Sequence, residues 1–467
     1  MKMSVYKPCD IRGPVSELSP ELYAAWGRSI GRRLDPGSDV YVGGDVRTST
    51  PEFLKALASG LCDTGARVHD LGIVPTPLVY FAKRTRAASA CAIVTASHNP
   101  PDRNGLKWMI GDRPPTEETV SEFEREQHEL GGGTTGGSFA KADVWKDYGQ
   151  WIAEVTEAPK SHGLRMLLDP GNGSWAGHAA GLYRKFFPGA AVEAIHDRRD
   201  GSFRERNPDS AIPQNLGTLK HRVMNEGFDV GLAFDGDGDR ISFVDERGNV
   251  LTAEEITAIL LSSFDNEMLG QAFVYDIKFS EVVPRAASAL GARAFVERSG
   301  HAFIRTRMLE EAALFGAEIS GHYFYRELDG GDDAFYTGLI LLRHLLRTGR
   351  SLSSLRSECH PVYMTPDVRI HANPEKASRV FELIRGKFGD ARITTVDGIK
   401  LTFAHGWALV RRSVTEPALT FRFEGTSRHD LDHIVSMFCD SVPGLKDAIS
   451  GEGSTAGDEH DKLFGDS

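Results

Sequence analysis

One order of segments occurs three times along this sequence, and it strongly restricts the possible folds. A short apolar run is followed by a loop, a helix-forming stretch, a Gly-Ala pair and a second apolar run, at residues 40–69, 164–193 and 272–295. Each copy ends its first apolar run with an aspartate, namely Asp45, Asp169 and Asp276. The order predicts strand, loop, helix and strand, so we expect three related α/β domains in tandem.

A fourth domain with a different pattern of apolar residues is expected after these three. Alternating apolar positions predict antiparallel strands at 368–371, 400–403 and 418–423, and a helix is expected at 429–441. We therefore expect α/β domains at 1–150, 151–253 and 254–362 and a smaller α+β domain at 363–450. The Gly-rich stretch 129–138 is expected to be a flexible surface loop, and the tail 451–467 is expected to be disordered.

Composition excludes several classes of partner. The 467 residues carry a net charge of -11 and no Lys/Arg-rich block, which argues against nucleic acid or an anionic membrane as a main partner. Five scattered cysteines without a CxxC pair argue against a disulfide framework and favour a reducing cytoplasm. No signal peptide or membrane span is expected, because no apolar run approaches about 20 residues.

Two polar loops follow buried apolar runs. Thr95-Ala-Ser-His-Asn-Pro100 presents the hydroxyl of Ser97 at a sharp turn, although such a serine is more often a local backbone partner. Asp235-Gly-Asp-Gly-Asp-Arg240 places three carboxylates at alternate positions, which suits one hard cation. A calcium loop ending at Glu246 is the competing interpretation, but Arg240 stands where the turn needs glycine, so magnesium is favoured.

Two further loops carry groups that suit a sugar phosphate. Glu318, Ser320 and His322 alternate, so in an extended segment they would point the same way toward vicinal hydroxyls, unless they lie on a solvent-exposed edge strand. A guanidinium and two hydroxyls, from Arg411, Ser413 and Thr415, could grip a phosphate or form a solvated turn. Taken singly, Lys107, Lys278 and His301 are ordinary polar residues, and so is Arg12 in the expected irregular loop 6–13.

Taken together, these loops make the chain resemble the α-D-phosphohexomutase family, and within it the phosphomannomutase/phosphoglucomutase group. TASHNP, DGDGDR, GAEISGH and GWALVRRSVTEP occur in the family's order and spacing across nearly the whole chain. The resemblance implies four domains around a central active-site cleft. It implies reversible phosphoryl transfer between the 1 and 6 positions of mannose and glucose phosphates, with a glucose or mannose 1,6-bisphosphate as intermediate and activator.

The resemblance also implies roles for individual residues. Ser97 would be carried as phosphoserine, and Asp235, Asp237 and Asp239 would hold Mg²⁺ together with its phosphoryl oxygen. Arg240 would neutralise the negative charge of the phosphoryl group during its transfer. Lys107, His98 and His301 are the candidate general acids or bases, with Lys107 preferred.

Substrate contacts follow from the same resemblance. Glu318 and Ser320 would bind the sugar's 3- and 4-hydroxyls, and because glucose and mannose differ only at carbon 2, both should be accepted. The other expected substrate contacts come from Arg12, Lys278, His322, Arg411, Ser413 and Thr415. We expect a monomer whose partners are small-molecule sugar phosphates.

Three departures from the family pattern and several rival functions remain at this stage. Cys9 and Ile319 stand where the group usually has Tyr and Met, and Val414 replaces a small or amide residue, so phosphate affinity or substrate preference could differ. A phosphoglucosamine mutase would share Ser97 and the metal loop. A non-catalytic sugar-phosphate sensor or a metal-dependent phosphatase are the alternatives from other classes.

Overall fold

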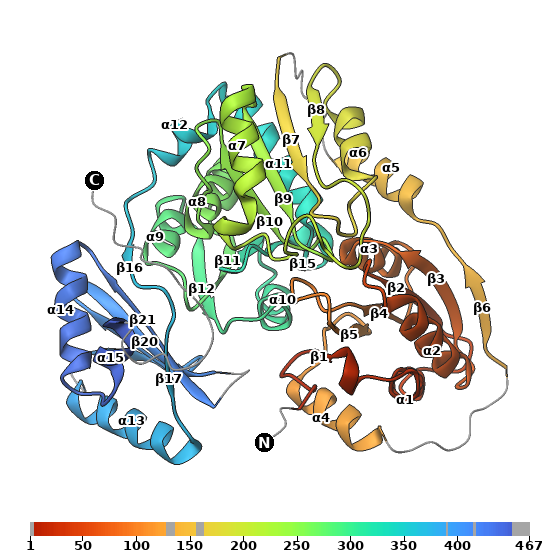
Figure 1. Cartoon of the computed structure of the whole chain (residues 1–467), viewed down its shortest axis with the longest axis horizontal. Helices are drawn as coiled ribbons and strands as arrows, with labels where there is room; N and C mark the ends of the chain where they lie inside the picture. The colour runs from red at the N-terminus through yellow and green to blue at the C-terminus, as the bar shows by residue number, and fades with distance from the viewer. Residues whose placement is uncertain (1–3, 128–135, 156–162, 389–390, 414–416, 451–467) are drawn as a thin grey trace. The chain divides into compact units, whose positions relative to one another are not determined.

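The computed structural model describes residues 4–127, 136–155, 163–388, 391–413 and 417–450. These residues form two compact units, which are divided in the sequence between His360 and Pro361. The first unit holds three mixed sheets with their helices, and the second holds one antiparallel sheet (Figure 1). The expected fold class, three α/β domains and a C-terminal α+β domain, is confirmed.

The first sheet has the strand order β1-β5-β4-β2-β3-β6. Its strands are β1 (Ile11–Pro14), β2 (Asp39–Gly44), β3 (Arg67–Ile73), β4 (Ala90–Val94), β5 (Arg103–Ile110) and β6 (Ser138–Lys141). Strands β2, β3, β4 and β6 run parallel, while β5 is antiparallel to both β4 and β1. Helices α1 and α2 pack side by side, and the helices of this region are α1 (Pro20–Gly31), α2 (Thr50–Cys62), α3 (Thr76–Thr85), α4 (Glu117–Glu126) and α5 (Trp145–Val155).

The second and third sheets repeat the parallel core. The second has the order β10-β9-β7-β8, with β7 (Arg165–Asp169), β8 (Ala191–Ala194), β9 (Val230–Phe234) and β10 (Ile241–Asp245). The third has the order β12-β11-β13-β14-β15, with β11 (Ala272–Asp276), β12 (Arg293–Glu297), β13 (Phe315–Ala317), β14 (Tyr323–Tyr325) and β15 (Gly331–Asp332). Their helices are α6 (Ala179–Phe186), α7 (Gly217–Glu226), α8 (Ala253–Ser263), α9 (Val282–Ala289), α10 (His301–Glu310), α11 (Ala334–Thr348) and α12 (Leu352–Arg356).

The second unit is an antiparallel sheet with helices. Its strands are β16 (Tyr363–Met364), β17 (Val368–His371), β18 (Arg392–Thr394), β19 (Ile399–Phe403), β20 (Gly406–Arg412) and β21 (Ala418–Gly425). The helices are α13 (Pro374–Lys387), α14 (Arg428–Cys439) and α15 (Leu445–Ser450). Alternation in β17 places Val368 and Ile370 in the core and exposes Arg369 and His371, as expected of a sheet with one covered face.

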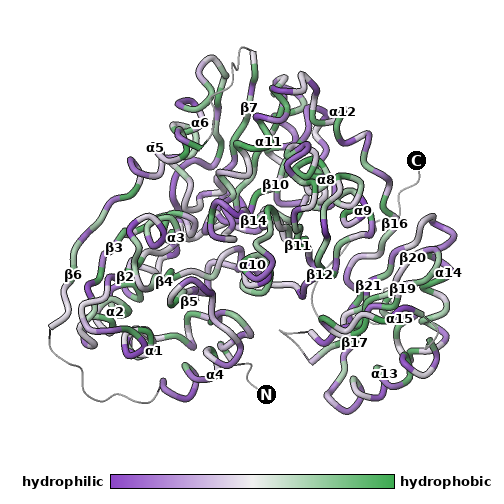
Figure 2. Tube along the Cα trace, turned by 180° about the vertical axis from the view of Figure 1, so that it is seen from behind, coloured by the Kyte–Doolittle hydropathy of each residue, from purple (hydrophilic) through white to green (hydrophobic). Residues whose placement is uncertain are grey.

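The apolar pattern explains why the elements pack as they do. Helix α8 begins with a capping box in which Thr252 and Glu255 bond reciprocally, and it buries Ile256, Ile259 and Leu260. Figure 2 colours much of the α8 trace as hydrophobic. Strands β4 and β9 are buried along their whole length, which is typical of strands covered on both faces. Among the described residues, none of the helices combines the length and apolarity needed to cross a membrane.

Several local expectations fail. Arg12 lies on strand β1, paired with Gly105 of β5, because the strand extends the first sheet where an irregular loop was expected. In the second repeat, at 164–193, the helix-forming stretch is expected to run from Ser174 to Phe187, but the helix begins only at Ala179, since residues 174–178 form turns against the loop 235–240. Ser138 begins β6, while the rest of the Gly-rich stretch falls mainly outside the described residues, as does the tail 451–467.

Candidate active site

Ser97 follows the buried strand β4 and is held in an unusual backbone conformation. Its φ of 54° is left-handed, and its side chain is fully buried. The Ser97 amide donates to Thr95 Oγ1 at 2.8 Å, and Ser97 Oγ donates to Asp235 Oδ2 at 3.0 Å. The hydroxyl singled out in the sequence therefore lies against the first carboxylate of the metal loop.

Arg47 holds the serine loop in place through hydrogen bonds to its backbone carbonyls, and no sequence motif predicted this role. The guanidinium donates to the Ser97 carbonyl at 2.8 Å and to three more carbonyls, those of Asn99, Pro100 and Arg103. Arg47 Nε pairs with Asp45 Oδ2 at 2.9 Å, and both side chains are fully buried. A planar fork with five donors is suited to gather carbonyls that bend away from a strand.

The metal loop connects β9 to β10 as a tight hairpin. The carboxylates of Asp235, Asp237 and Asp239 are buried and lie within 4.8 Å of one another. A Cβ on Gly236 would lie 2.7 Å from the Ser97 carbonyl oxygen, so only glycine allows the two loops to approach this closely. Because strands flank the loop and Glu246 bonds to Ser353, the helix-loop-helix calcium interpretation is wrong.

The donor set of this loop fits a hard cation. Asp237 Oδ1 and Asp239 Oδ1 are buried with no hydrogen-bond partner among the described residues. Burial, with Asp237 and Asp239 nearby, raises the pKa of Asp235 well above its usual range. Burial also acts to raise the pKa of Asp237, but Lys107 outweighs it and holds that pKa well below normal. Three crowded carboxylates of this kind are relieved by a divalent cation with oxygen ligands.

Lys107 lies among these carboxylates. It is on β5, opposite Ile93 of β4, and its Nζ is 2.8 Å from Asp237 Oδ2 and also bonds Asp239 Oδ2. Burial lowers the pKa of Lys107, but the two aspartates raise it by more, so it lies above its usual value. In this arrangement Lys107 is a cation that can donate a proton but not accept one.

Arg240 belongs to a buried chain of three side chains. Its Nε donates to His322 Nε2 at 2.9 Å, and His322 Nδ1 lies 2.5 Å from Asp332 Oδ2. Because Nε2 accepts, the proton of the neutral imidazole is assigned to Nδ1, toward Asp332. Burial, opposed by Asp239 but aided by Arg240, lowers the pKa of His322 well below its usual value. Asp332 was not predicted as a site residue, because it does not stand in a recognisable sequence motif.

His98 and His301 approach the site from different elements. His98 Nδ1 lies 3.4 Å from Ser97 Oγ, and burial followed by Arg240 and Arg12 lowers the pKa of His98 well below normal. His301 is the first residue of α10, and its Nε2 lies 3.9 Å from Asp10 Oδ2. Arg12 Nη2 is 2.6 Å from the same oxygen, which ties β1 to the site.

The loop from Glu318 to His322 is a turn, so the expectation of an extended segment is wrong. The Gly321 amide donates to the Glu318 carbonyl at 3.0 Å, and the Glu318 amide donates to the His322 carbonyl at 2.9 Å. His322 therefore points to Arg240 and Asp332 and is not aligned with Glu318 and Ser320. Glu318 Oε2 and Ser320 Oγ are buried without a hydrogen-bond partner in the described part of the chain.

Lys278 and Glu318 are the charged residues in and beside the loop 318–322, here called the sugar loop. The Lys278 amide donates to Asp276 Oδ1 at 3.0 Å, directly after β11. Burial, followed by the charge of Asp276, raises the pKa of Glu318 above its usual value. The sugar loop therefore combines a desolvated carboxylate with hydroxyl and ammonium groups from neighbouring segments.

The expected phosphate loop belongs to the second unit. Arg411, near the end of β20, has its Nε 3.1 Å from Asp397 Oδ2, and the Ser413 amide donates to the Ala418 carbonyl at 2.8 Å. Thr415 and Val414 lie outside the described residues. Arg411 lies on β20, and Ser413 directly follows the end of that strand.

Comparison with known proteins gives the same family over most of the chain. Models described as phosphoglucomutase/phosphomannomutase alpha/beta/alpha domains I, II and III match residues 5–128, 146–248 and 252–363, and the model of the C-terminal domain matches 370–441. A phosphomannomutase/phosphoglucomutase of Pseudomonas aeruginosa is 32% identical over 96% of this chain and 97% of that protein.

Two further relatives agree. A phosphoglucomutase of Neisseria gonorrhoeae is 31% identical over 93% of this chain and 95% of that protein. The crystal structure of a phosphoglucomutase/phosphomannomutase family protein from Burkholderia thailandensis has a TM-score of 0.87 at 29% identity, covering 96% of this chain and 98% of that one. The chain belongs to the phosphoglucomutase/phosphomannomutase family of phosphohexomutases.

Proposed function

We propose that this chain is a phosphomannomutase/phosphoglucomutase that moves a phosphoryl group reversibly between the 1 and 6 positions of mannose and glucose phosphates. The observation that carries the proposal is the hydrogen bond from Ser97 Oγ to Asp235, which is one of three neighbouring buried carboxylates. Relatives that match most of the chain are named phosphomannomutase/phosphoglucomutase and phosphoglucomutase. Ser97 would carry the phosphoryl group, and a sugar 1,6-bisphosphate would be the intermediate.

The side chains around Ser97 suit phosphoryl transfer. Asp235, Asp237 and Asp239 would hold Mg²⁺, and the bound ion supplies positive charge that neutralises the phosphoryl group. Arg240, oriented by its bond to His322, adds a second positive charge near the same place. Arg47 holds the serine loop so that its geometry does not change between the two transfers.

Three groups are proposed to move the proton of the sugar hydroxyl. Lys107 reaches the carboxylates from β5 and is protonated, so it suits the role of a general acid that donates a proton. His98 is neutral beside Ser97, which suits a base. His301, at the start of α10, is the third candidate.

Binding of the sugar phosphate is proposed to use the polar loops identified in the sequence. Glu318 and Ser320 would accept and donate hydrogen bonds to the 3- and 4-hydroxyls, because their buried polar atoms have no hydrogen-bond partner among the described residues. Arg12 and Lys278 would add positive charge, and His322 would act through Arg240. Arg411, Ser413 and Thr415 are proposed to hold the phosphate that is not being transferred.

The surroundings of the enzyme are proposed from composition. A net charge of -11 and five cysteines, free where the structure describes them, suit a monomer in a reducing cytoplasm. Small-molecule sugar phosphates would be its partners, without nucleic acid or membrane.

The test is a coupled assay with Mg²⁺ and a catalytic amount of glucose 1,6-bisphosphate. Mannose 1-phosphate and glucose 1-phosphate are compared at matched concentrations, with glucosamine 1-phosphate as the third substrate. Comparable conversion of the first two supports dual specificity. Turnover of glucosamine phosphate alone would overturn it in favour of a phosphoglucosamine mutase, and phosphate release without isomerisation would indicate a phosphatase.

A further inference from the structure

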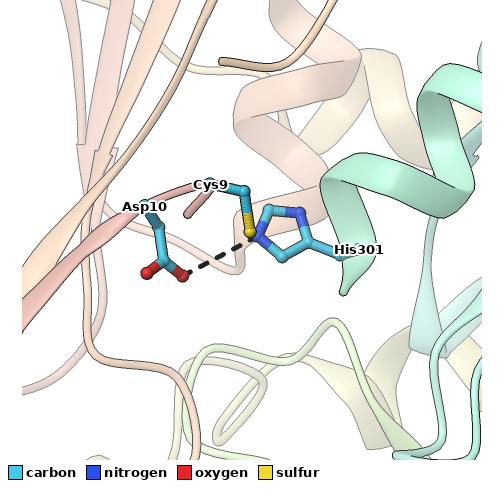
Figure 3. Close-up of side chains that lie close together, drawn as sticks. All are labelled: Cys9, Asp10 and His301. Carbon is cyan, nitrogen blue, oxygen red and sulfur yellow. Dashed lines mark ion pairs between the residues drawn. The ribbon is translucent and has the colours of Figure 1, made fainter. Parts of the chain in front are cut away.

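Among the described residues, one cluster of metal-ligating side chains shares no residue with the metal loop. Cys9, Asp10 and His301 place a sulfur, a carboxylate oxygen and an imidazole nitrogen within 4.8 Å of one another (Figure 3). Cys9 and Asp10 directly precede strand β1, while His301 begins helix α10, nearly three hundred residues later. The fold, and not a local sequence motif, brings the three donors together.

The types of donor differ from those of the metal loop. Thiolate, imidazole and carboxylate together are the ligands of Zn²⁺ and similar thiophilic cations, whereas an all-oxygen set suits Mg²⁺. Asp235, Asp237 and Asp239 offer no sulfur or nitrogen of their own. The mixed donor set would therefore prefer a cation such as Zn²⁺, and the all-oxygen set of the metal loop would prefer Mg²⁺.

The one nitrogen–oxygen distance between the imidazole and the carboxylate is close to that of a zinc site. With zinc–ligand bonds of about 2.0–2.3 Å in a tetrahedron, neighbouring donor atoms lie roughly 3.3–3.7 Å apart. His301 Nε2 lies 3.9 Å from Asp10 Oδ2. For this nitrogen–oxygen pair, contraction by about half an ångström would be enough, which rotation of side chains can provide.

A second observation is independent of the spacing. His301 Nε2 is a buried atom with no hydrogen-bond partner within the part of the chain that the structure describes. Leaving such an atom unsatisfied costs about 1–3 kcal/mol, so its environment favours a ligand. In Figure 3 the ring turns this nitrogen toward Cys9 and Asp10.

Arg12 supports the carboxylate from outside the cluster. Its Nη2 lies 2.6 Å from Asp10 Oδ2 and fixes the orientation of that group. Hydrogen bonds of this kind to ligating carboxylates are typical of the residues that surround protein metal sites.

We propose that Cys9, Asp10 and His301 form a site for a thiophilic divalent cation of the Zn²⁺ class, separate from the magnesium loop. The three side chains leave a fourth position open for water or a substrate oxygen. Binding replaces the thiol proton: the S–H bond breaks, the proton leaves to solvent, and the sulfur electron pair forms the bond to the metal.

Occupancy of the site has a consequence that rests on the proposed function. Because His301 is a candidate proton-transfer group and Arg12 a candidate substrate contact, a cation held here would inhibit the mutase. The inhibition would persist at saturating Mg²⁺, since Mg²⁺ does not compete for thiolate.

Binding is tested with Co²⁺ as an optical probe on the full chain in excess Mg²⁺. A thiolate bound to Co²⁺ gives an intense near-ultraviolet charge-transfer band, which carboxylates of the metal loop cannot give. We expect one equivalent of Co²⁺ to produce the band and Zn²⁺ to abolish it by displacement. Absence of the band in the unmodified protein overturns the proposal.

Variants locate the site. Cys9→Ser is expected to abolish the band, and His301→Gln to weaken Co²⁺ binding at least tenfold. Cys62→Ser is the matched control, because Cys62 is also partly buried but lies on α2 and belongs to none of the metal-ligand clusters among the described residues, and it should keep the band. A band that survives Cys9→Ser, or that disappears in Cys62→Ser, contradicts the assignment. Circular dichroism checks that each variant is folded.

The activity arm separates this inference from the proposed function. Zn²⁺ is titrated into the mutase assay at saturating Mg²⁺, with the unmodified protein beside Cys9→Ser. Relief of inhibition in Cys9→Ser supports the regulatory consequence, and equal inhibition contradicts it. A protein that shows the thiolate band but no mutase turnover would leave the cation site standing and overturn the proposed function alone.

Discussion

Two neighbouring regions of the first unit are built in opposite ways. In the transfer region, here Ser97, Arg47 and the metal-loop aspartates, nearly every polar group is held by another part of the protein. In the sugar region, here Lys278, His301, Glu318 and Ser320, three buried atoms have no hydrogen-bond partner among the described residues: His301 Nε2, Glu318 Oε2 and Ser320 Oγ.

The difference indicates what each region is for. Groups that stabilise charge in a transition state act best when they are fixed beforehand, so the transfer region is rigidly bonded. A buried polar atom without a partner costs about 1–3 kcal/mol, which is tolerated where a ligand supplies the missing bond. The exceptions in the transfer region, Asp237 Oδ1 and Asp239 Oδ1, are expected ligands of a cation.

The largest effect should come from the serine. Ser97→Ala removes the hydroxyl that carries the phosphoryl group, and mutase turnover should fall by roughly 10³-fold or more, on the scale of losing a nucleophile. Alanine tolerates the φ of 54° about as poorly as serine, so the fold should be unchanged. Near-normal turnover of a folded variant would remove Ser97 from the mechanism.

The metal loop should show the next largest effect. Asp237→Asn removes one carboxylate charge and weakens the pairing with Lys107, so half-saturation by Mg²⁺ should need about 100-fold more metal. Asp112→Asn, which changes an exposed aspartate in the same way, is the control. An unchanged metal titration would contradict the assignment of the loop.

Substitution of Arg47 tests whether phosphoryl transfer depends on a rigidly held serine loop. Arg47→Lys keeps the charge beside Asp45 but loses the fork that holds four carbonyls, so kcat should fall about 10- to 100-fold by misplacing Ser97. KM for the sugar phosphate should change little. The control Arg67→Lys alters an exposed ion pair with Asp39. A rise in KM at constant kcat would show that Arg47 acts on binding and would contradict the contrast between the transfer region and the sugar region.

The sugar region should respond in the opposite way. Glu318→Gln keeps the size of the side chain but replaces an ionised hydrogen bond worth about 1.5–3 kcal/mol, so KM should rise roughly 10- to 100-fold. Phosphorylation of Ser97 by the bisphosphate at saturating concentration should remain nearly normal. Loss of phosphorylation with unchanged KM would place Glu318 in the transfer step.

The sequence predicts the loops that carry the motifs but not their support. Ser97 and the aspartates at 235, 237 and 239 follow apolar runs, and these runs are strands β4 and β9 with the expected bounds. Arg47 was missed because it stands in a polar stretch typical of a surface loop. Its burial depends on carbonyls about fifty residues later in the chain, which no local pattern reveals.

The errors in the sugar region have a similar cause. Alternation of Glu318, Ser320 and His322 favours an extended segment only if no backbone bonds form within it, and here two such bonds close a turn. Asp332 became recognisable only through His322, to which β15 brings it. Side-chain direction in short loops is set by tertiary contacts, while strand and helix patterns are set locally.

The most direct test of the account is to find where phosphate is held. The protein is incubated with glucose 1,6-bisphosphate and Mg²⁺, digested, and the phosphorylated peptide is identified by mass spectrometry beside Ser97→Ala. We predict one phosphate on Ser97, formed as bisphosphate is converted to monophosphate, and none in the variant. A protein that isomerises sugar phosphates while Ser97 stays unmodified, or that carries the phosphate on another residue, would contradict the central claim.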